Sequence, residues 1–238
     1  AMNGTPKQMV LSLAISNHFS VESLEELYEG IHLACEEYGI DLIGGDTTSS
    51  RTGLCINITI LGEAQTDKIV YRSTAKENQL ICVTGDLGAA YMGLQLLERE
   101  KVVFDGNEQK QPDFAGYEYI LERQLKPEAR KDIIALLKEK EILPTAMIDI
   151  SDGLASEIMH ICKDSGVGCN IYEERIPIDY QTYKMAEELN MNATVCALSG
   201  GEDYELLFTV PLDQHDLVST LPGISIIGHT CKASLGCQ

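Results

Sequence analysis

The stretch that constrains the fold most is residues 149–154, with the sequence DISDGL. An apolar run, residues 146–148, leads into it, and a run of helical character, residues 155–161, leads out of it. We therefore expect a strand, a turn and a helix in succession, with Gly153 in a backbone conformation that other residues avoid. Such a turn places two carboxylates and a hydroxyl next to the unpaired N–H groups at the start of the helix.

Two interpretations of this turn are open from the stretch itself. The carboxylates can bind a hard cation that also holds a phosphate group. Alternatively, Asp152 or Ser151 simply caps the helix. Two similar acidic stretches, residues 44–48 (GGDTT) and 200–206 (GGEDYEL), favour the first interpretation, and we expect both of them to form turns as well.

Strand-like and helical runs alternate along the chain. Met9, Leu11 and Leu13 recur at every second position and predict a strand with one strongly apolar face. A helix capped by Ser20 is expected to follow this strand and to end at Gly39. Further strands are expected at residues 42–43, 54–61, 80–84, 146–149, 167–172, 204–210 and 224–227, further helices at 89–98, on both sides of Pro127, and at 155–166, 183–189 and 213–221, and a long loop at 101–115.

This alternation predicts an α/β or α+β fold with two halves. The chain of 238 residues is long enough to bury a core in one or two domains. We place the N-terminal domain at residues 1–73 and the C-terminal domain at residues 74–238, with the connection at residues 68–73.

The strong negative charge argues against two classes of partner. With 37 acidic and 18 basic residues, the formal net charge is −19, whereas nonspecific binding to nucleic acid or to an anionic membrane needs basic patches. No apolar run approaches the roughly 18 residues of a membrane span. A phosphorylated substrate is compatible with this charge if divalent cations mediate the contact.

The eight cysteines and five histidines do not have the spacing of a zinc site. No two cysteines form a C-x-x-C pair, and the histidines form no H-x-x-x-H pair. Most of the cysteines lie in apolar runs, where a free cysteine behaves as a small buried apolar residue. We interpret them as reduced thiols in the core of a cytoplasmic protein.

Further candidate ligands lie outside the DISDGL turn. The two glycines of residues 44–48 let a ligand approach the backbone, and Asp46 after them would be a metal ligand. Arg72 follows an apolar pair and is placed to clamp a phosphate. Taken singly, an ordinary Gly-Asp turn and a surface arginine are the simpler interpretations of these residues. Residues 85–88 lack the spacing of a dinucleotide or P-loop motif, and we interpret them as a packing turn.

Carboxylates and glycines on separate turns, with almost no basic residues beside them, suit Mg²⁺ together with phosphate oxygens. This pattern fits metal-assisted phosphoryl transfer.

Four segments of the chain together resemble the thiamine-monophosphate kinase family: residues 43–48 (IGGDTT), 71–76 (YRSTAK), 147–154 (MIDISDGL) and 198–206 (LSGGEDYEL). Members of this family are ATP-dependent enzymes of the superfamily that includes aminoimidazole ribonucleotide synthetase and selenophosphate synthetase. The resemblance runs in register over nearly the whole chain, and the GEDYEL stretch is its most family-specific part. It implies the two-domain aminoimidazole ribonucleotide synthetase-like fold, in which the N-terminal halves of a homodimer build a shared barrel.

The resemblance also implies a role for particular residues by their position. The implied magnesium ligands are Asp46, Asp149 and Asp152. The implied contacts to ATP are Gly45, Asp46, Arg72 and Ser151, and the implied contact to the substrate is Glu202. No residue is implied as a catalytic acid or base. The implied reaction is the ATP- and Mg²⁺-dependent phosphorylation of thiamine monophosphate to thiamine diphosphate, in thiamine diphosphate biosynthesis, by a cytoplasmic homodimer that binds neither nucleic acid nor membrane.

Two other functions stay open at this point. An ATP-driven ring closure of the aminoimidazole ribonucleotide synthetase type would use the same fold, although the GEDYEL stretch disfavours it. A non-catalytic nucleotide-binding paralogue would also retain the fold. The family's N-terminal segment, with further acidic metal ligands and a glycine-rich stretch, does not occur in this sequence, and the C-terminal end is shorter, so we expect the sequence to be part of a longer protein.

Overall fold

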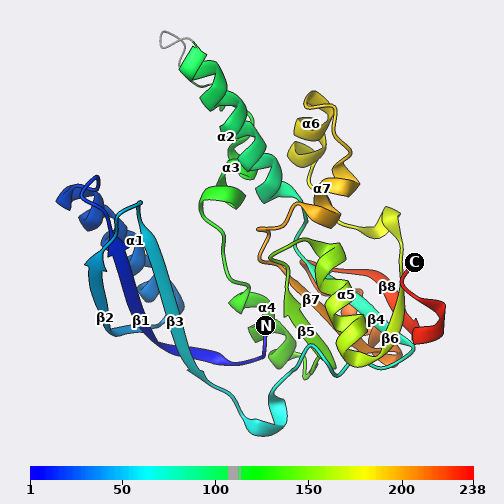
Figure 1. The fold of residues 1–238 in the computed structure, drawn as a ribbon. Coiled ribbons are helices and arrows are strands. Elements are labelled where there is room, and N and C mark those ends of the chain that lie inside the picture. The colour runs from blue at the N-terminus through cyan, green and yellow to red at the C-terminus, as the bar shows by residue number, and fades with distance from the viewer. Residues whose placement is uncertain (107–111, 113) are drawn as a thin grey trace. The chain divides into compact units, whose positions relative to one another are not determined.

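The computed structural model describes residues 1–106, 112 and 114–238 (Figure 1). The chain divides into two compact units: Asn3–Ile69, called the N-terminal unit, and Val70–Gln238 with Ala1–Met2, called the C-terminal unit. Both units combine a sheet with helices, which confirms the expected mixed α/β class. The expected domain boundary between residues 73 and 74 stays a prediction.

The N-terminal unit is a three-stranded sheet with one long helix. Its strands are β1 (Thr5–Ile15), β2 (Asp41–Ser49) and β3 (Cys55–Glu63), in the order β2-β1-β3. β1 is parallel to β2 and antiparallel to β3, and the helix α1 (Val21–Tyr38) makes the crossover between the two parallel strands. The expected ends of α1 are confirmed: the Ser20 hydroxyl accepts from the Ser23 N–H at 3.1 Å, and Gly39 ends the helix with a φ of 66°.

The apolar face predicted for β1 is confirmed, since Met9, Leu11 and Leu13 are buried. Their partners across the sheet on β3 are Ile60, Ile58 and Ile56, in the same order. These isoleucines belong to the same face, because directly opposed residues point to the same side of a sheet. All three are exposed, so the described chain covers the apolar face of this sheet only in part.

The expectation that residues 44–48 form a turn is wrong, because they continue β2. Gly45 pairs with Leu11 and Asp46 pairs with Ser12 along the parallel ladder, after an irregularity between Met9 and Val10. A Cβ atom on Gly45 would lie 1.8 Å from the carbonyl oxygen of Leu11. Gly45 is therefore needed because β1 and β2 approach each other too closely at this point for a side chain. The strand pairing continues through residues 44–48 although their sequence resembles that of a turn.

The C-terminal unit contains a five-stranded sheet in the order β5-β7-β4-β8-β6, and each pair of neighbours is antiparallel. The strands are β4 (Gln79–Thr84), β5 (Ala146–Asp149), β6 (Val167–Ile171), β7 (Leu206–Pro211) and β8 (Ile224–Lys232). The helices are α2 (Ala89–Gly106), α3 (Glu118–Leu125), α4 (Lys131–Glu139), α5 (Leu154–Ser165), α6 (Tyr180–Glu188), α7 (Ala193–Ser199) and α8 (His215–Val218). In the described residues, no helix combines the length and the apolar character that crossing a membrane would require.

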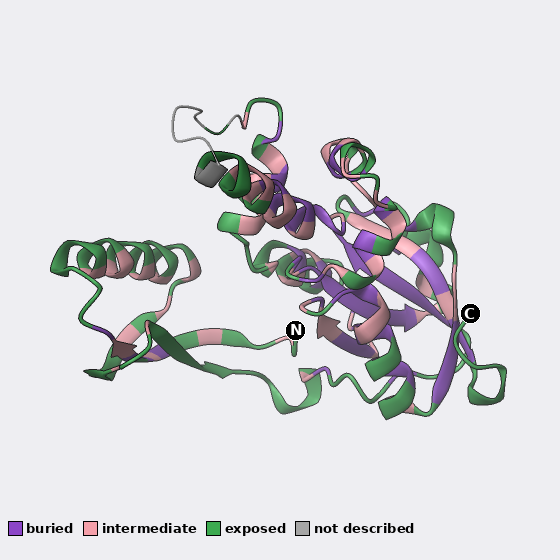
Figure 2. Ribbon diagram, turned by 45° about the horizontal axis from the view of Figure 1, so that its top comes forward, coloured by how far each residue is buried: buried purple, intermediate pink, exposed green. Residues whose placement is uncertain are grey.

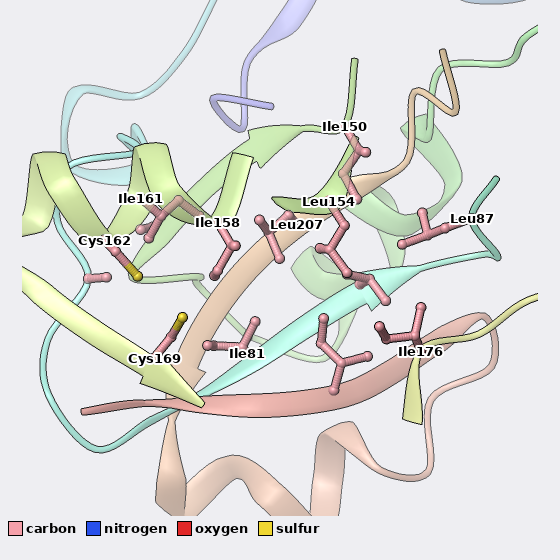
Figure 3. Packing of buried hydrophobic residues seen from close by; sticks show 14 of the residues in the cluster. Ile81, Leu87, Ile150, Leu154, Ile158, Ile161, Cys162, Cys169, Ile176 and Leu207 are labelled. Atoms are coloured by element: carbon pink, nitrogen blue, oxygen red, sulfur yellow. The ribbon is translucent and has the colours of Figure 1, made fainter. Parts of the chain in front are cut away.

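Helices cover both faces of this sheet, and the buried residues concentrate in its strands (Figure 2). Ile81 and Val83 of β4 belong to an apolar cluster that α5 completes on one face (Figure 3). Leu80 and Cys82, which point the other way, belong to a second cluster with residues of α4 and α8. A third cluster joins α2, α3, α6 and α7.

Several element boundaries differ from the expectation. The loop expected at residues 101–115 is wrong for residues 101–106, because α2 continues to Gly106; residues 107–111 and 113 lie outside the described part. The helix α7 was not expected, because its short run of small and β-branched residues reads equally well as a strand. Strand β8 continues to Lys232, five residues beyond its expected end at Ile227.

We predict that Phe208→Ala lowers the free energy of unfolding by about 3–5 kcal/mol, because Phe208 is fully buried in the middle of β7 and its removal leaves a cavity. Urea unfolding followed by circular dichroism measures this loss. Phe104→Ala in α2 is the matched control, because Phe104 is exposed and the same truncation there should cost far less. Equal losses in the two variants would contradict the assignment of Phe208 to the core.

Candidate functional site

The DISDGL turn and the GEDYEL stretch (residues 201–206) lie side by side. Strands β5 and β7 are antiparallel neighbours, and their pairing continues beyond the strands into these two acidic segments. Three main-chain hydrogen bonds join the segments: the Ile150 N–H donates to the Glu205 carbonyl at 2.7 Å, the Glu202 N–H to Ser151 at 2.8 Å, and the Tyr204 N–H to Ile150 at 2.8 Å. Segments about fifty residues apart in the sequence therefore form one site.

The helix-capping interpretation of the DISDGL turn is wrong. Gly153 occupies the N-cap position of α5 with a φ of 105°, which confirms the conformation expected for it, and no side chain caps the helix. Glu157 of α5 stabilises the turn. Its Oε1 accepts from the Asp152 N–H at 3.1 Å and from the Ser151 hydroxyl at 3.5 Å. The carboxylate of Asp152 is therefore not used to begin the helix.

Tyr204 contacts one carboxylate of the site and senses the charge of two others. Its hydroxyl donates to Glu202 at 2.8 Å. This hydrogen bond raises the pKa of Tyr204, and burial and the negative charges of Glu202, Asp149 and Asp152 raise it further. Glu202 and Tyr204 both adopt positive φ angles, 62° and 52°, which non-glycine residues rarely do. Strained backbone of this kind is typical of segments that position functional side chains.

The side chains at this site suit a hard cation. Across the described ranges, neither Asp149 nor Asp152 forms an ion pair, and both carboxylates are at least partly accessible. The second oxygen of the buried Glu157, Oε2, also meets no hydrogen-bond donor there, and an unpartnered buried oxygen is costly unless a cation or water satisfies it. No three acidic or histidine side chains of the described part lie within ligand distance of one another. A magnesium ion here would therefore use one or two carboxylates together with water and substrate oxygens.

The structure brings together Asp149, Ser151, Asp152 and Glu202 of the predicted site residues. Gly45 and Asp46 lie in β2 of the N-terminal unit and are exposed. Arg72 lies in the C-terminal unit, where its Nε pairs with the carboxylate of Asp164 at 2.8 Å while about half of the side chain, 52%, stays exposed. The roles expected for all seven of these residues stay predictions.

A buried ion network under the site was not predicted. The carboxylate of Glu205, 1% exposed, pairs with Arg123 Nη1 at 3.0 Å and with Arg130 Nη1 at 2.7 Å, and it also accepts from the Thr84 hydroxyl. The same hydroxyl accepts from the Leu206 N–H at 2.8 Å. The two guanidinium groups therefore tie the GEDYEL stretch to the α3–α4 segment, and the Thr84 hydroxyl ties it to the end of β4.

Asp203 is the most perturbed acid of the site. Its Oδ2 accepts from the Gly88 N–H at 2.8 Å, so the turn at residues 85–88 does serve packing, as expected, and it also contacts the site. Burial raises the pKa of Asp203 to about 7, while the bond from Gly88 and the charge of Arg123 act in the opposite direction. Arg123 also donates to the Asp203 carbonyl at 3.0 Å. Asp203, with a pKa of about 7, is therefore about half protonated near neutral pH.

The comparison with known proteins identifies the family. The family model for the AIR synthase related protein, N-terminal domain, matches residues 1–64, and the model for the C-terminal domain matches residues 76–216. The thiamine-monophosphate kinase of Bacillus subtilis is 34% identical over 218 residues, which cover 92% of this chain and 63% of that protein. The crystal structure of the thiamine monophosphate kinase of Aquifex aeolicus matches with a TM-score of 0.82 and 31% identity over 98% of this chain and 73% of that one. The chain belongs to the thiamine-monophosphate kinase family.

A second structure, of AaThiL complexed with AMPPCP and TMP, matches with a TM-score of 0.84 and 31% identity, and covers 98% of this chain and 69% of that one. These likenesses confirm the two-domain aminoimidazole ribonucleotide synthetase-like fold that the motifs implied. The chain spans less than two thirds of the length of the first thiamine-monophosphate kinases it matches, 63% and 65%.

We predict that Asp203→Asn flattens the pH dependence of stability between about pH 4 and pH 7. The folded-state pKa of about 7 lies above the ordinary value of 3.8, so the protonated carboxyl stabilises the fold fully below pH 4, and this contribution is lost as the pH rises through 7. The loss amounts to at most about 4 kcal/mol. Urea unfolding at several pH values measures it.

Asp213→Asn is the matched control for this experiment, because Asp213 is exposed and the variant should keep the slope of the parent protein. At pH 8 the Asp203→Asn variant should be at least as stable as the parent. An unchanged slope in Asp203→Asn would show that another group carries the pH dependence.

Proposed function

We propose that this chain is the nucleotide- and substrate-binding part of an enzyme that transfers the γ-phosphoryl group of ATP to thiamine monophosphate and so forms thiamine diphosphate. The observation that carries the proposal is the hydrogen-bonded pair of acidic segments, DISDGL and GEDYEL, in a chain of the thiamine-monophosphate kinase family. The related AaThiL structure with AMPPCP, an analogue of ATP, and TMP supports the same pair of substrates.

The residue roles are those that the family resemblance implies, and the chemistry of the acidic side chains is compatible with them. Asp149 and Asp152, together with Asp46, would hold Mg²⁺, because ionised carboxylates are its preferred protein ligands. Gly45, Asp46, Arg72 and Ser151 would contact ATP, and Glu202 would contact thiamine monophosphate. The main-chain bonds that hold the segment of Asp149 and Asp152 beside that of Glu202 support a site in which cation and substrate meet.

The reaction needs no general base from the protein. The acceptor is a phosphate monoester, which is mostly a dianion at neutral pH because its second pKa is about 6. One of its oxygens attacks the γ-phosphorus in line, and ADP leaves with the electrons of the broken P–O bond. The obstacle is repulsion, which between two unit charges at 4 Å amounts to about 4 kcal/mol at an effective dielectric constant of 20.

Bound Mg²⁺ would neutralise part of this phosphate charge and favour the in-line arrangement of the two groups. The contribution of the chain is to hold the ligands in fixed positions. The conformation of the DISDGL turn is fixed by the main-chain bonds between the two segments and by the buried Glu157. Substrate binding therefore need not reorganise the turn. Glu202 is oriented by its bond from Tyr204.

We predict that Asp149→Asn in the full-length protein loses about a hundredfold or more of its turnover, while its free energy of unfolding changes by less than about 0.5 kcal/mol. The variant keeps the shape of the side chain and removes the charge that a cation needs. Chromatographic detection of thiamine diphosphate, formed from ATP, Mg²⁺ and thiamine monophosphate, measures turnover.

Asp213→Asn, an exposed carboxylate outside the site, should keep full turnover. Unchanged turnover of Asp149→Asn at saturating Mg²⁺ would remove Asp149 from the mechanism. If the parent protein binds ATP but forms no thiamine diphosphate, the substrate assignment is wrong, and the ring-closing substrates of the related synthetases become the next to test.

We also propose that the full protein is a cytoplasmic homodimer in which the N-terminal units complete a shared barrel. The partly uncovered face of the N-terminal sheet supports this, because Ile56, Ile58 and Ile60 are apolar and exposed in the described chain. Burying such a face stabilises an interface by roughly 25 cal/mol per Å² of apolar surface.

Light scattering should therefore give twice the mass of one full-length chain, and Ile58→Asp should shift the protein toward the monomer. Thr59→Asp is the control on the opposite face of the same strand, and it should leave the mass unchanged. A monomeric parent protein would contradict the shared barrel.

A further inference from the structure

Three cysteines from separate segments come together in the C-terminal unit. The Sγ atoms of Cys162, Cys169 and Cys237 all lie within 4.8 Å of one another. Figure 3 shows the thiols of Cys162 and Cys169 pointing toward each other between α5 and β6. The sequence spacing does not reveal this cluster, and the site proposed for ATP and thiamine monophosphate does not use it.

The three cysteines are free thiols, and the main chain sets their positions without a disulfide. Cys162 lies in the last turns of α5, and the helix ends at Gly166, so that β6 turns back and brings Cys169 next to it. Cys237 follows a short 3₁₀ turn, η4 (Ala233–Leu235), and forms a parallel bridge with Cys169.

Three backbone hydrogen bonds hold this bridge. The Cys169 N–H donates to the Gly236 carbonyl at 3.1 Å, the Gln238 N–H to the Cys169 carbonyl at 2.9 Å, and the Ile171 N–H to the Gln238 carbonyl at 2.8 Å. The thiols therefore need no ion to approach one another, and the cluster is preorganised for a ligand that uses all three.

The cluster is closed on one side and open on the other. Cys162 and Cys169 are buried, whereas Cys237 is exposed. An ion can thus reach the thiols from solvent, and a fourth ligand, such as water, can complete its coordination. Three protein ligands with one open position is a common arrangement for zinc.

We propose that Cys162, Cys169 and Cys237 bind one thiophilic metal ion, Zn²⁺, with the fourth coordination position open to solvent. A Zn–S distance of about 2.3 Å and tetrahedral geometry place the sulfurs about 3.8 Å apart. Closing separations of up to 4.8 Å to that value requires side-chain shifts of about 1 Å, which the exposed Cys237 can supply. Binding displaces the thiol protons, which pass to the solvent, and it changes no oxidation state.

The alternative to metal binding at such a cluster is a disulfide. A disulfide would join two of the three sulfurs and leave the third alone, whereas a metal ion uses all three. Bound zinc would tie together the end of α5, the edge strand β6 and the segment after η4. It would stabilise the folded unit against unfolding, because the unfolded chain does not hold the three thiolates together.

The test measures zinc in the purified full-length chain after incubation with Zn²⁺ under reducing conditions and removal of the excess by gel filtration. We expect one zinc per chain in the parent protein and a rise in its unfolding temperature on addition of zinc. Cys169→Ser and Cys237→Ser should both lose the retained zinc and the temperature shift. Because Cys237 is exposed, its substitution should disturb the packing of the core least. Circular dichroism of the variants checks that they fold.

Cys231→Ser is the matched control. Cys231 is buried nearby, but its thiol donates to the carbonyl oxygens of Lys232 and Gly236 at 3.7 and 3.8 Å and is not part of the cluster of three thiols. This variant should retain the zinc. Absence of bound zinc from the parent protein would overturn the proposal, and so would equal retention by Cys169→Ser and Cys237→Ser. A parent chain isolated with a mass lower by two hydrogens, and without zinc after reduction, would assign the cluster to a disulfide instead.

Discussion

The pairing of β5 with β7 is the interaction on which the candidate site depends. Both strands continue into acidic segments, whose negatively charged side chains repel one another. Main-chain hydrogen bonds carry no net charge, so they hold Ser151 beside Glu202 and Ile150 beside Tyr204 despite the carboxylates around them. The like charges that remain unpaired are what a divalent cation would neutralise.

Below this acidic surface the charges are paired. Arg123 and Arg130 both contact the buried Glu205, and Arg123 also donates to the main chain of Asp203. A buried carboxylate is tolerated only with such partners, because its desolvation is costly. The three carboxyl groups of the GEDYEL stretch therefore differ in their surroundings. That of Glu205 anchors the stretch, that of Asp203 is buried with a pKa raised to about 7, and that of Glu202 is exposed to the solvent.

Local patterns predicted most of the secondary structure. The strand, turn and helix around Gly153 were predictable because each depends on neighbouring residues: an apolar run, a glycine and a helical period. The same logic failed at Gly44–Asp46, because two glycines before an acid resemble a turn, whereas pairing with β1 keeps them in a strand. The ion network was missed because its partners lie 75 residues apart or more, so no local pattern links them.

The sequence by itself determined the family, the alternation of strands and helices, and the identity of the acidic segments, because motifs and periodicity are local properties of the chain. Only the tertiary structure decided which of these segments meet. It placed the segment of Asp149 and Asp152 beside that of Glu202 and Tyr204, gave Asp203 its raised pKa, and gathered three cysteines that look unrelated in the sequence. Long-range strand pairing and burial produce these effects, and neither is a property of any single stretch of residues.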